Sequence, residues 1–392
     1  MTETSKVLES GWSRVKFGDV VRVSKERCQD PLVDGVERFI GLEHIDPEDL
    51  RIKRWGNVAD GITFTNVFKP GQVLFGKRRA YQRKVAVADF SGVCSGDIYV
   101  LESRDATILL PELLPFICQT EAFFDHAVGT SAGSLSPRTN WKSLAEFEFA
   151  LPPMDKQKCM THAFGVLEEN LTLLSVASTA AHSLELSRLE DALASVSKHG
   201  LVPVEQLVTT GPKNGLSPKV NADERGYPTL SISAVRGGRI VTEGNVKYAE
   251  VTENQAAAFE LKANDVLVVR GNGNKMLTGQ CGIVGTVPLG CFYPDLLICL
   301  KFDAKIIRPE FAALQWNAPS THRRLISRAK TTNGIWKING SDIRKHTLKV
   351  PSIEDQDISL EEIRTIRQAR VDIERRKVTI QALKVLALNE IS

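Results

Sequence analysis

The chain lacks the residue patterns that mark metal centres, disulfide frameworks and nucleophilic active sites. Its seven cysteines are odd in number and scattered, without a C-x-x-C pair, which argues against disulfides and a zinc cluster. The seven histidines contain no pair at metal-ligand spacing, and no serine or cysteine lies in a recognisable nucleophile elbow. We therefore expect reduced cysteines, no metal on this chain and no catalytic residue.

Long apolar runs and a strong charge imbalance are also missing. No segment approaches the length needed to span a bilayer, and the first residues contain no apolar core of a signal peptide. The net charge of +3 is too small to indicate a nucleic-acid partner by itself. With 392 residues, 42% of them apolar, the chain is long enough for two full domains, and we expect it in the cytoplasm.

The chain does contain an internal repeat with a shift of roughly 200 residues. The segment LPPMDKQ at 151–157 returns as VPSIEDQ at 350–356, and KPGQVLF at 69–75 returns as KANDVLV at 262–268. A period this long indicates a duplicated domain rather than a solenoid. We therefore expect two similar globular units related by a pseudo-twofold axis.

Each copy opens with short β-type runs separated by glycine, proline, aspartate and basic residues, as in a compact α+β domain. A helix is expected near 111–124 in the first copy and near 309–328 in the second, with a proline close to its start. The predicted organisation is listed here by range: first globular unit 12–154, first long helix 155–198, second globular unit 199–353 and second long helix 354–392.

After each proline-containing stop, apolar residues recur at steps of three and four, which predicts two helices of roughly 60 and 50 Å. Neither globular unit could cover such a length, so we expect the helices to pair as an antiparallel coiled coil. The expected pairing and partner-docking residues are Phe164, Leu167, Leu171, Leu174, Ile363, Ile366, Ile373, Ile380 and Leu383. Arg370 and Lys377 interrupt the second stripe, so two independent surface helices remain the alternative.

Two loops that follow strand-like runs carry cations, amides and an aromatic residue. The segment 69–88 contains six Lys or Arg residues and no acidic residue. Such side chains can neutralise phosphates, stack on bases and bond to base edges, whereas the alternative is a solvated basic loop. The candidates are Lys77, Arg78, Arg79, Tyr81, Gln82, Arg83 and Lys84, and in the second copy Arg270, Asn272, Asn274 and Lys275.

Two further loops occupy matched positions before the proline stops, at 130–142 and 330–337. They combine small hydroxyl and amide side chains with Arg and Lys, which suits close approach to a phosphate backbone; a plain turn would explain only the glycine and asparagine. The candidates are Arg138, Thr139, Asn140 and Lys142 in the first copy, and Lys330, Thr331, Thr332, Asn333 and Lys337 in the second.

Two enzyme-like patterns remain as alternatives. Asp295, Asp303 and Lys305 resemble the signature of a Mg²⁺-dependent nuclease, although the matched first copy lacks the lysine. Gly271, Asn272 and Gly273 loosely resemble a dinucleotide loop, but the spacing departs from G-x-G-x-x-G. Neither pattern is specific.

The order of these blocks along nearly the whole chain resembles the specificity subunit of type I restriction-modification systems. The blocks that carry the resemblance are 71–81, 95–98, 265–273 and the stops at 151–153 and 350–351. The resemblance implies that each unit reads one half of a bipartite, asymmetric site in double-stranded DNA and that the helices set the gap between the halves.

The same resemblance implies partners. Two adenine-methylating modification subunits would dock on the helices and bring S-adenosylmethionine, and restriction subunits that translocate DNA would bring ATP and Mg²⁺. This chain would carry no cofactor. Its Leu151-Pro152-Pro153-Met154 lacks both flanks of the modification subunit's catalytic tetrapeptide, so it is expected to be no enzyme. A protein-binding scaffold without DNA remains a further alternative.

Overall fold

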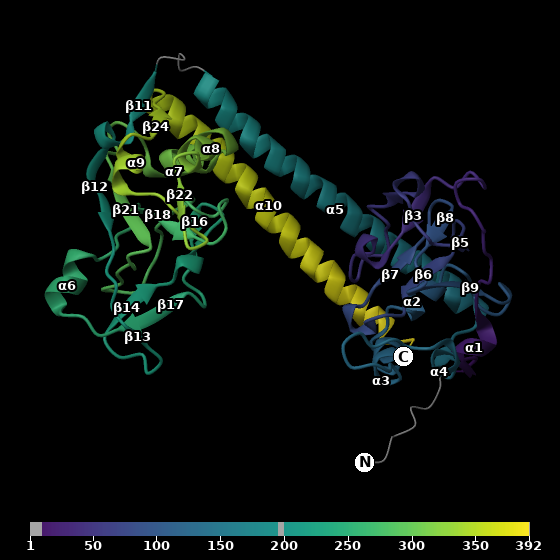
Figure 1. The fold of residues 1–392 in the computed structure, drawn as a ribbon. Helices are drawn as coiled ribbons and strands as arrows, with labels where there is room; N and C mark the ends of the chain where they lie inside the picture. The colour runs from purple at the N-terminus through teal and green to yellow at the C-terminus, as the bar shows by residue number, and fades with distance from the viewer. Residues whose placement is uncertain (1–9, 195–199, 392) are drawn as a thin grey trace. The chain divides into compact units, whose positions relative to one another are not determined.

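The computed structural model describes residues 10–194 and 200–391, and the chain divides into two compact units (Figure 1). The first unit comprises Met1–Val176 and Glu374–Ser392, and the second comprises Ala177–Ile373. Both boundaries fall inside long helices, so each unit contains a part of both helices. Strands and short helices are mixed in each unit, which confirms the expected α+β class. Among the described residues, no helix has the length and hydropathy to cross a membrane.

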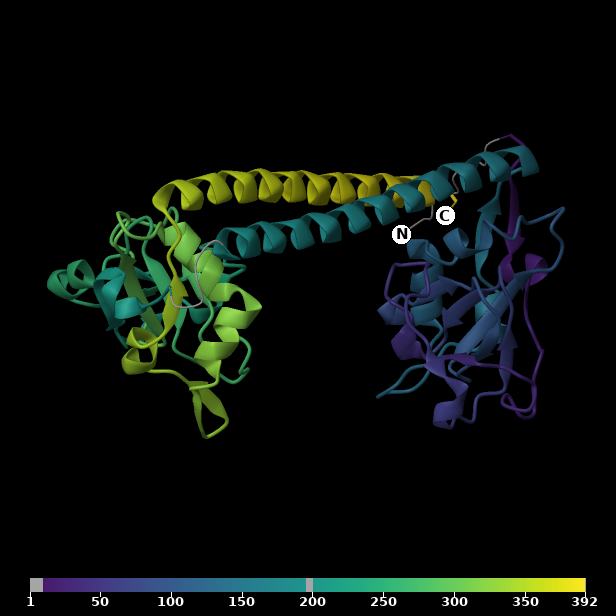
Figure 2. The ribbon, with the colours of Figure 1, turned by 90° about the horizontal axis from the view of Figure 1, so that it is seen from above.

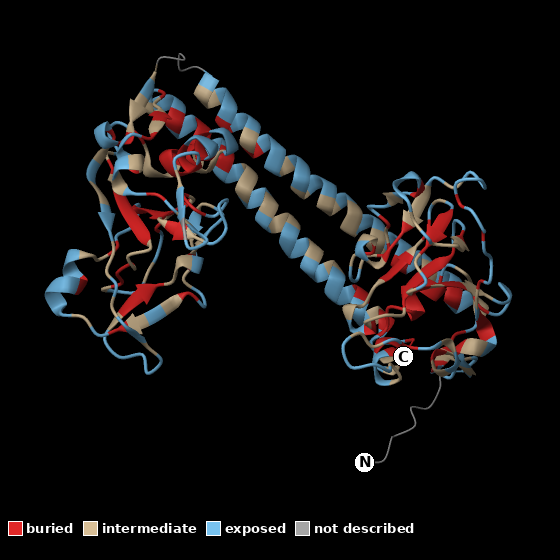
Figure 3. Ribbon diagram, in the orientation of Figure 1, coloured by how far each residue is buried: buried red, intermediate tan, exposed pale blue. Residues whose placement is uncertain are grey.

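The first unit is built on two four-stranded sheets and one strand pair. One sheet has the order β2 (Val21–Val23), β9 (Ile98–Ser103), β6 (Val73–Gly76), β7 (Val85–Val87), and the other β4 (Gly56–Asn57), β3 (Arg38–Ile40), β8 (Gly92–Cys94), β5 (Asn66–Phe68). The opening strand β1 (Ser13–Lys16) pairs with β10 (Glu148–Leu151), which leads into the proline stop. All four residues of β6 are buried, because this strand lies inside its sheet with core on both faces (Figure 3).

The helices of the first unit are α1 (Phe17–Val20), α2 (Leu114–Ile117), α3 (Glu121–Gly129) and α4 (Trp141–Ala145), with 3₁₀ turns η1 (Leu42–His44), η2 (Val58–Asp60) and η3 (Ala80–Gln82). The single helix expected near 111–124 is therefore wrong. The chain breaks at Thr120, which is extended and whose side chain caps α3 by accepting from Phe123 N.

The second unit has a six-stranded sheet, two three-stranded sheets and a strand pair. The large sheet has the order β12 (Val208–Asn214), β21 (Leu297–Phe302), β18 (Val266–Val269), β20 (Cys281–Ile283), β16 (Arg239–Ile240), β15 (Val235–Arg236). One smaller sheet has the order β13 (Val220–Asn221), β17 (Val246–Ala249), β14 (Tyr227–Leu230), and the other has the order β19 (Gly271–Asn272), β23 (Ile335–Lys337), β22 (Lys330–Thr332). The strand pair is β11 (Leu201–Pro203) with β24 (Thr347–Lys349). The β18–β21 pairing repeats β6–β9, and β11–β24 repeats β1–β10.

The helices of the second unit are α6 (Glu253–Ala258), α7 (Pro309–Asn317), α8 (Pro319–Ile326) and α9 (Gly340–Arg344), with 3₁₀ turns η4 (Val204–Gln206) and η5 (Ile232–Ala234). The helix expected over 309–328 is two helices. Ala318 is extended immediately before Pro319, since a residue that precedes proline disfavours helical geometry.

The two long helices are α5 (Met154–Ala194) and α10 (Ile353–Leu388), of 41 and 36 residues. Within each unit their segments lie side by side (Figure 2). In the first unit Phe164 of α5 shares a core with Leu388 and Ile391, and in the second Leu189 of α5 shares a core with Ile363. The start of α5 thus packs near the end of α10, and the end of α5 near the start of α10, which is an antiparallel arrangement.

The contact face of α10 is not a purely apolar stripe. Leu383, expected to face the partner helix, is 51% exposed, whereas the adjacent Lys384 is 7% exposed. Arg370, which interrupts the apolar pattern, donates to Glu185 of α5. Charged residues therefore occupy positions in the contact face that periodicity assigned to apolar residues, because each has a carboxylate within reach.

Candidate nucleic-acid interface

In the first unit the backbone joins the two basic loops 77–84 and 130–142. Arg79 N donates to Pro137 O at 2.7 Å, and Thr139 N donates to Lys77 O at 3.0 Å. Between them, Arg78 and Arg138 form an isolated antiparallel bridge. Residues about 60 positions apart in the sequence thus form one surface.

One carboxylate holds the arginines of this surface. Asp97 follows β8 and accepts from Arg78 Nη1 at 3.1 Å and from Arg138 Nε at 2.9 Å. Ser136 Oγ accepts from Arg78 Nε at 2.6 Å and from Arg79 Nε at 3.2 Å. Two guanidinium groups share one acid and the third is held by a hydroxyl group, so the cluster keeps a positive excess and its side chains are held in place before any ligand binds.

Lys77 belongs to the same cluster. Its Nζ lies over the Tyr99 ring, 4.6 Å from the centroid. Burial lowers the pKa of the Lys77 ammonium; Asp97 opposes this shift, and the nearby cations Arg138 and Arg27 add to it. Arg27 comes from a distant loop, and no pattern in the sequence marked it as a candidate. Cations close enough to lower the pKa of Lys77 favour an anion between them.

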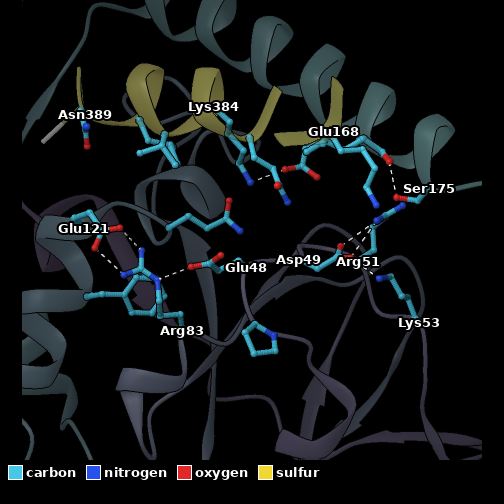
Figure 4. A pocket seen from close by; sticks show the side chains of 18 residues that line it. Glu48, Asp49, Arg51, Lys53, Arg83, Glu121, Glu168, Ser175, Lys384 and Asn389 are labelled. Atoms are coloured by element: carbon cyan, nitrogen blue, oxygen red, sulfur yellow. Dashed lines mark hydrogen bonds and ion pairs between the residues drawn. The ribbon is translucent and has the colours of Figure 1, made fainter. Parts of the chain in front are cut away.

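The end of the first loop is held differently. Tyr81 is exposed and Gln82 half-buried in η3, whereas Arg83 donates to both carboxylate oxygens of Glu121 at 2.7 Å (Figure 4). Lys84 Nζ donates to Leu42 O at 2.6 Å. Arg83 and Lys84 are thus bound by acceptors within the protein, and Tyr81 is the side chain of this part that remains open to a ligand.

Three candidates of the second loop differ in exposure. Thr139 is buried, with its Oγ1 3.3 Å from Thr130 Oγ1. Asn140 caps α4 by accepting from Ser143 N at 2.9 Å. Lys142, in the first turn of α4, is exposed. The polar residues Thr139 and Asn140 therefore position the loop, and the cation faces solvent.

In the second unit the sheet β19–β23–β22 brings the two corresponding loops together. Gly271 pairs with Lys337 and Asn272 with Trp336. Ile338 N donates to Arg270 O at 2.9 Å, which repeats the contact of Thr139 N with Lys77 O in the first unit. The same junction therefore forms twice, from loops that differ in sequence.

The hairpin of β22 and β23 carries the exposed candidates Lys330, Thr331, Asn333 and Lys337; the side chain of Thr332 lies outside the described part of the structure. Asn333 and Gly334 have φ of 50° and 75°, as a two-residue turn with left-handed residues requires. Lys330 lies directly opposite Lys337. Like charges paired across strands are unfavourable, and an anion between them would relieve the repulsion.

The loop after β18 has its own fixed geometry. Arg270 Nη1 lies 3.9 Å from Asp295 Oδ2, as Arg78 pairs with Asp97 in the first unit. Asn274 N donates to Asn272 Oδ1 at 2.9 Å, and Lys275 Nζ lies 4.4 Å from the centroid of the Trp336 ring. The segment Gly96-Asp97-Ile98 returns as Pro294-Asp295-Leu296 in the sequence repeat, and the equivalence of the two aspartates was the signal that could have identified their role.

Buried aromatic and imidazole groups support this loop from behind. Trp316 Nε1 donates to Gly279 O at 2.7 Å, and His322 Nε2 lies 2.8 Å from Thr278 O. His346, 4.8 Å from Trp316 between ring centroids, is buried. Burial, together with Arg324, Arg328 and His322, lowers the pKa of His346 to about 3.

This histidine makes the second unit sensitive to acid. As the pH is lowered below 6.5, the unfolded chain binds a proton at His346, whereas the folded unit binds it only near pH 3. The free energy of unfolding therefore decreases as the pH is lowered through this window. We expect a loss of about 2 kcal/mol in unfolding free energy between pH 7 and 5. This loss is measured by denaturation experiments that are monitored by hydrogen exchange of segments in the second unit. His346→Phe should flatten this dependence, whereas the exposed His162→Gln should leave it; equal slopes in all three proteins would contradict the assignment.

The nuclease residues do not converge. Asp295 precedes β21 and Asp303 follows it, so the strand alone separates them by about 17 Å. Asp303 Oδ1 accepts from Lys305 N at 2.9 Å, a turn contact. Across residues 10–194 and 200–391 no group of three or more His, Cys, Asp or Glu could hold a metal ion. Gly271 and Asn272 of the dinucleotide-like pattern lie in β19, not in a strand-turn-helix unit.

The first unit also contains a cavity of about 450 Å³ between its globular part and its helix segments (Figure 4). Its charges are paired across the lining, Arg83 with Glu121 and Lys384 with Glu168. Burial opposes ionisation of Asp49, but hydrogen bonds from Arg51 and Lys53 outweigh it and lower the pKa of Asp49 to about 2. Arg51 Nη1 also donates to Thr172 Oγ1 of α5 at 2.6 Å, so these charges attach the helix to the globular part.

The sequence was compared with family profiles and with curated proteins. No family profile matches the chain. The chain is 31% identical over 150 residues to the type I restriction enzyme EcoKI specificity subunit of Escherichia coli strain K12, an alignment that covers 38% of the chain and 32% of that subunit. The chain spans about a third of the length of the curated relatives it matches.

Two solved structures share the fold. A chain from work on the complex assembly and conformational transition of the type I R-M system aligns with a TM-score of 0.61 and 15% identity over 98% of both chains. The S subunit of a type I restriction-modification system from M. genitalium aligns with a TM-score of 0.56 and 12% identity, over 99% of this chain and 97% of that one. The resemblance found in the sequence is therefore confirmed: over about 150 residues the chain is similar to specificity subunits of type I restriction-modification systems, and over nearly its whole length it shares the fold of the two solved chains.

Proposed function

We propose that this chain is the DNA-recognition subunit of a type I restriction-modification complex in the cytoplasm and that it catalyses no reaction itself. Each globular unit, 12–154 and 199–353, reads one half of a bipartite site in double-stranded DNA. The helical segments 155–198 and 354–392 set the gap between the halves. The specificity subunits that the chain resembles support this assignment.

The observation that carries the proposal is the repeated junction of two polar, basic loops. In each unit, a loop after a buried strand receives a backbone hydrogen bond from the loop before the proline stop. Each junction places basic side chains beside one aspartate: Arg78 and Arg138 contact Asp97, and Arg270 lies near Asp295. Such an excess of positive charge on an ordered backbone suits a phosphate chain, and the amide and guanidinium groups beside it suit base edges.

The two junctions carry different side chains, so we propose that the half-sites differ in sequence. The first offers Arg78, Arg79 and Arg138 with the exposed Tyr81, and the second offers the Lys275–Trp336 pair. Arginine and lysine bind guanine by geometry that depends on their approach to the groove. Methylome sequencing should reveal an asymmetric site, and identical half-sites would contradict this part of the proposal.

The helices also present apolar side chains to solvent. In the first unit Val166 and Leu173 of α5, and Val378 and Val385 of α10, are exposed at seven-residue spacing. Exposed heptad stripes are typical of helices that pack against further helices. We propose that two modification subunits, which carry S-adenosylmethionine, dock on these stripes. Restriction subunits that use ATP and Mg²⁺ would complete the assembly.

Footprinting and titration of the chain assembled with its modification partner test the proposal. We expect two short protected DNA segments separated by a fixed gap. The affinity should fall by about 10³-fold or more between 50 and 200 mM salt if six or more phosphates are neutralised. An affinity that does not change with salt, or protection of one continuous segment, would contradict the proposal. A protein scaffold without DNA would give no protection at all.

A further inference from the structure

Two buried ion pairs join α5 to α10, one inside each unit. In the first unit, Lys384 Nζ lies 2.5 Å from Glu168 Oε1. In the second, Glu185 accepts from Arg367 Nε at 2.7 Å and from Arg370 Nη1 at 2.9 Å. Lys384 and Glu185 are each 7% exposed. Removing such charges from water costs about as much as their attraction returns, so apolar residues would hold the helices together equally well.

Both ion pairs require the same alignment of the two helices. Glu185 follows Glu168 on α5 by 17 residues, and Arg367 precedes Lys384 on α10 by the same number. In an antiparallel pair, equal spacings on the two strands mean that a single register satisfies both contacts.

The apolar residues do not define this register alone. Ile366, Ile373 and Ile380 follow one another along α10 at seven-residue intervals, and all three are half-buried. A slip of α10 by one heptad would therefore replace isoleucine by isoleucine along much of the stripe. Apolar packing along this stretch distinguishes poorly between such registers, because it is not directional. At the two ends of the helix, Leu388 in the first core and Ile363 in the second favour the same register as the charges.

The charges do distinguish them. A slip by one heptad in one direction would place Glu168 opposite Lys377 but Glu185 opposite Leu360, which leaves one buried carboxylate without a partner. A slip in the other direction would place Glu185 opposite Glu374 and Glu168 opposite Ile391. Both alternatives carry an uncompensated or repelled charge in the contact face, which is strongly unfavourable.

We propose that the Glu168–Lys384 pair and the Glu185–Arg367–Arg370 cluster specify one register of the α5–α10 pair. A heptad slip moves one helix along the other by about 10 Å, which corresponds to about three base pairs of B-DNA. The consequence for DNA rests on the function proposed above: if the helices set the gap, these charges make the protein accept a single gap length.

The test replaces the charges by leucine in one variant, Glu168→Leu, Glu185→Leu, Arg367→Leu, Arg370→Leu and Lys384→Leu. Spin labels at Gly165→Cys and Leu386→Cys, in a Cys159→Ser background, report the register without DNA. Both label sites are exposed, and Cys159 is the exposed cysteine in the described part of the chain. With the native charges we expect one narrow distance distribution. In the leucine variant we expect at least one further population, with the melting temperature unchanged or raised.

The same proteins, assembled with their modification partner, are then titrated with DNA whose gap varies in single base pairs. The native complex should prefer one gap at least tenfold over gaps three base pairs longer or shorter. The leucine variant should retain less than a threefold preference.

Two controls separate register from simple loss of charge. Exchange of one pair, Glu168→Lys with Lys384→Glu, keeps the attraction and should keep a single distance and the gap preference. Neutralisation of an exposed pair on the same helices, Arg188→Gln with Glu362→Gln, should change neither.

The outcomes distinguish this proposal from the one it rests on. A leucine variant with a single distance and an intact gap preference would overturn the register proposal and leave the proposed function standing. A native protein with a single distance but no gap preference would leave the register proposal standing and contradict the proposal that the helices set the gap. A leucine variant that no longer folds cooperatively would show that the charges stabilise the helix pair, and this too would overturn the register proposal.

Discussion

Substitution of Leu388 and Ile391 by alanine is expected to destabilise the first unit by about 4–8 kcal/mol, although both residues lie at the far end of the chain. Leu388 is 6% exposed and Ile391 is fully buried, in the core that contains Phe116 and Phe164. Each truncation removes apolar contacts and leaves a cavity that the surrounding rings, stacked 4.5 Å apart, cannot fill without moving. Hydrogen exchange resolved by segment measures the loss.

A matched pair of leucines lies near the end of α10, just before Leu388. Leu383 and Leu386 are 51% and 65% exposed, so their substitution by alanine removes similar atoms from solvent rather than from a core. We expect an effect below about 1 kcal/mol for that control. Equal destabilisation by the two double variants, or faster exchange in the second unit instead of the first, would show that the C-terminal residues do not complete the first core.

Substitution of Arg78 and Arg138 by alanine is expected to weaken DNA binding by about 2–6 kcal/mol. Both guanidinium groups are held by Asp97 at one loop junction, with donors still free to reach a phosphate or a base edge. Titration of the assembled complex at several salt concentrations measures the change. A smaller salt slope indicates lost phosphate contacts, and relaxed sequence preference at an unchanged slope indicates lost base contacts.

The control removes the same charge from the same unit. Arg14 and Arg22 are paired with Glu148 and Glu102 and lie away from the loop junction in sequence. Their substitution by alanine should weaken binding less than about threefold, since each of these arginines is paired with its own carboxylate and, among the described residues, makes no contact within the loop junction. If both double variants bind equally well, the loop junction is merely a solvated basic surface, which was the simpler interpretation of the sequence.

Parts of the candidate site were not accessible from the sequence. Arg83 counts as one more cation in a basic segment, but the fold places it against Glu121 and Glu48 (Figure 4). Arg27, in contrast, lies some 50 residues before Lys77 and still acts on its pKa. Local composition gives the number of cations in a segment, whereas the partner of each cation depends on distant loops that only the folded chain brings near.

Lys384 and Leu383 illustrate the same point for the helices. Periodicity assigned Leu383 to the contact face because leucine is apolar, yet the lysine beside it is buried next to Glu168. A one-residue difference rotates a helix position by about 100°, and the sequence of one helix does not show where the other helix presents a carboxylate.

By itself, the sequence determined the duplication, the α+β character of the two copies and the existence of two long helices, because each depends on local order, spacing and periodicity. The tertiary structure decided which loops meet and which carboxylate holds which cation. It also decided that the last residues of the chain complete the first core. These features arise from contacts between residues tens to hundreds of positions apart, whose free energy depends on distance and burial in the folded chain and leaves no periodic mark along the sequence.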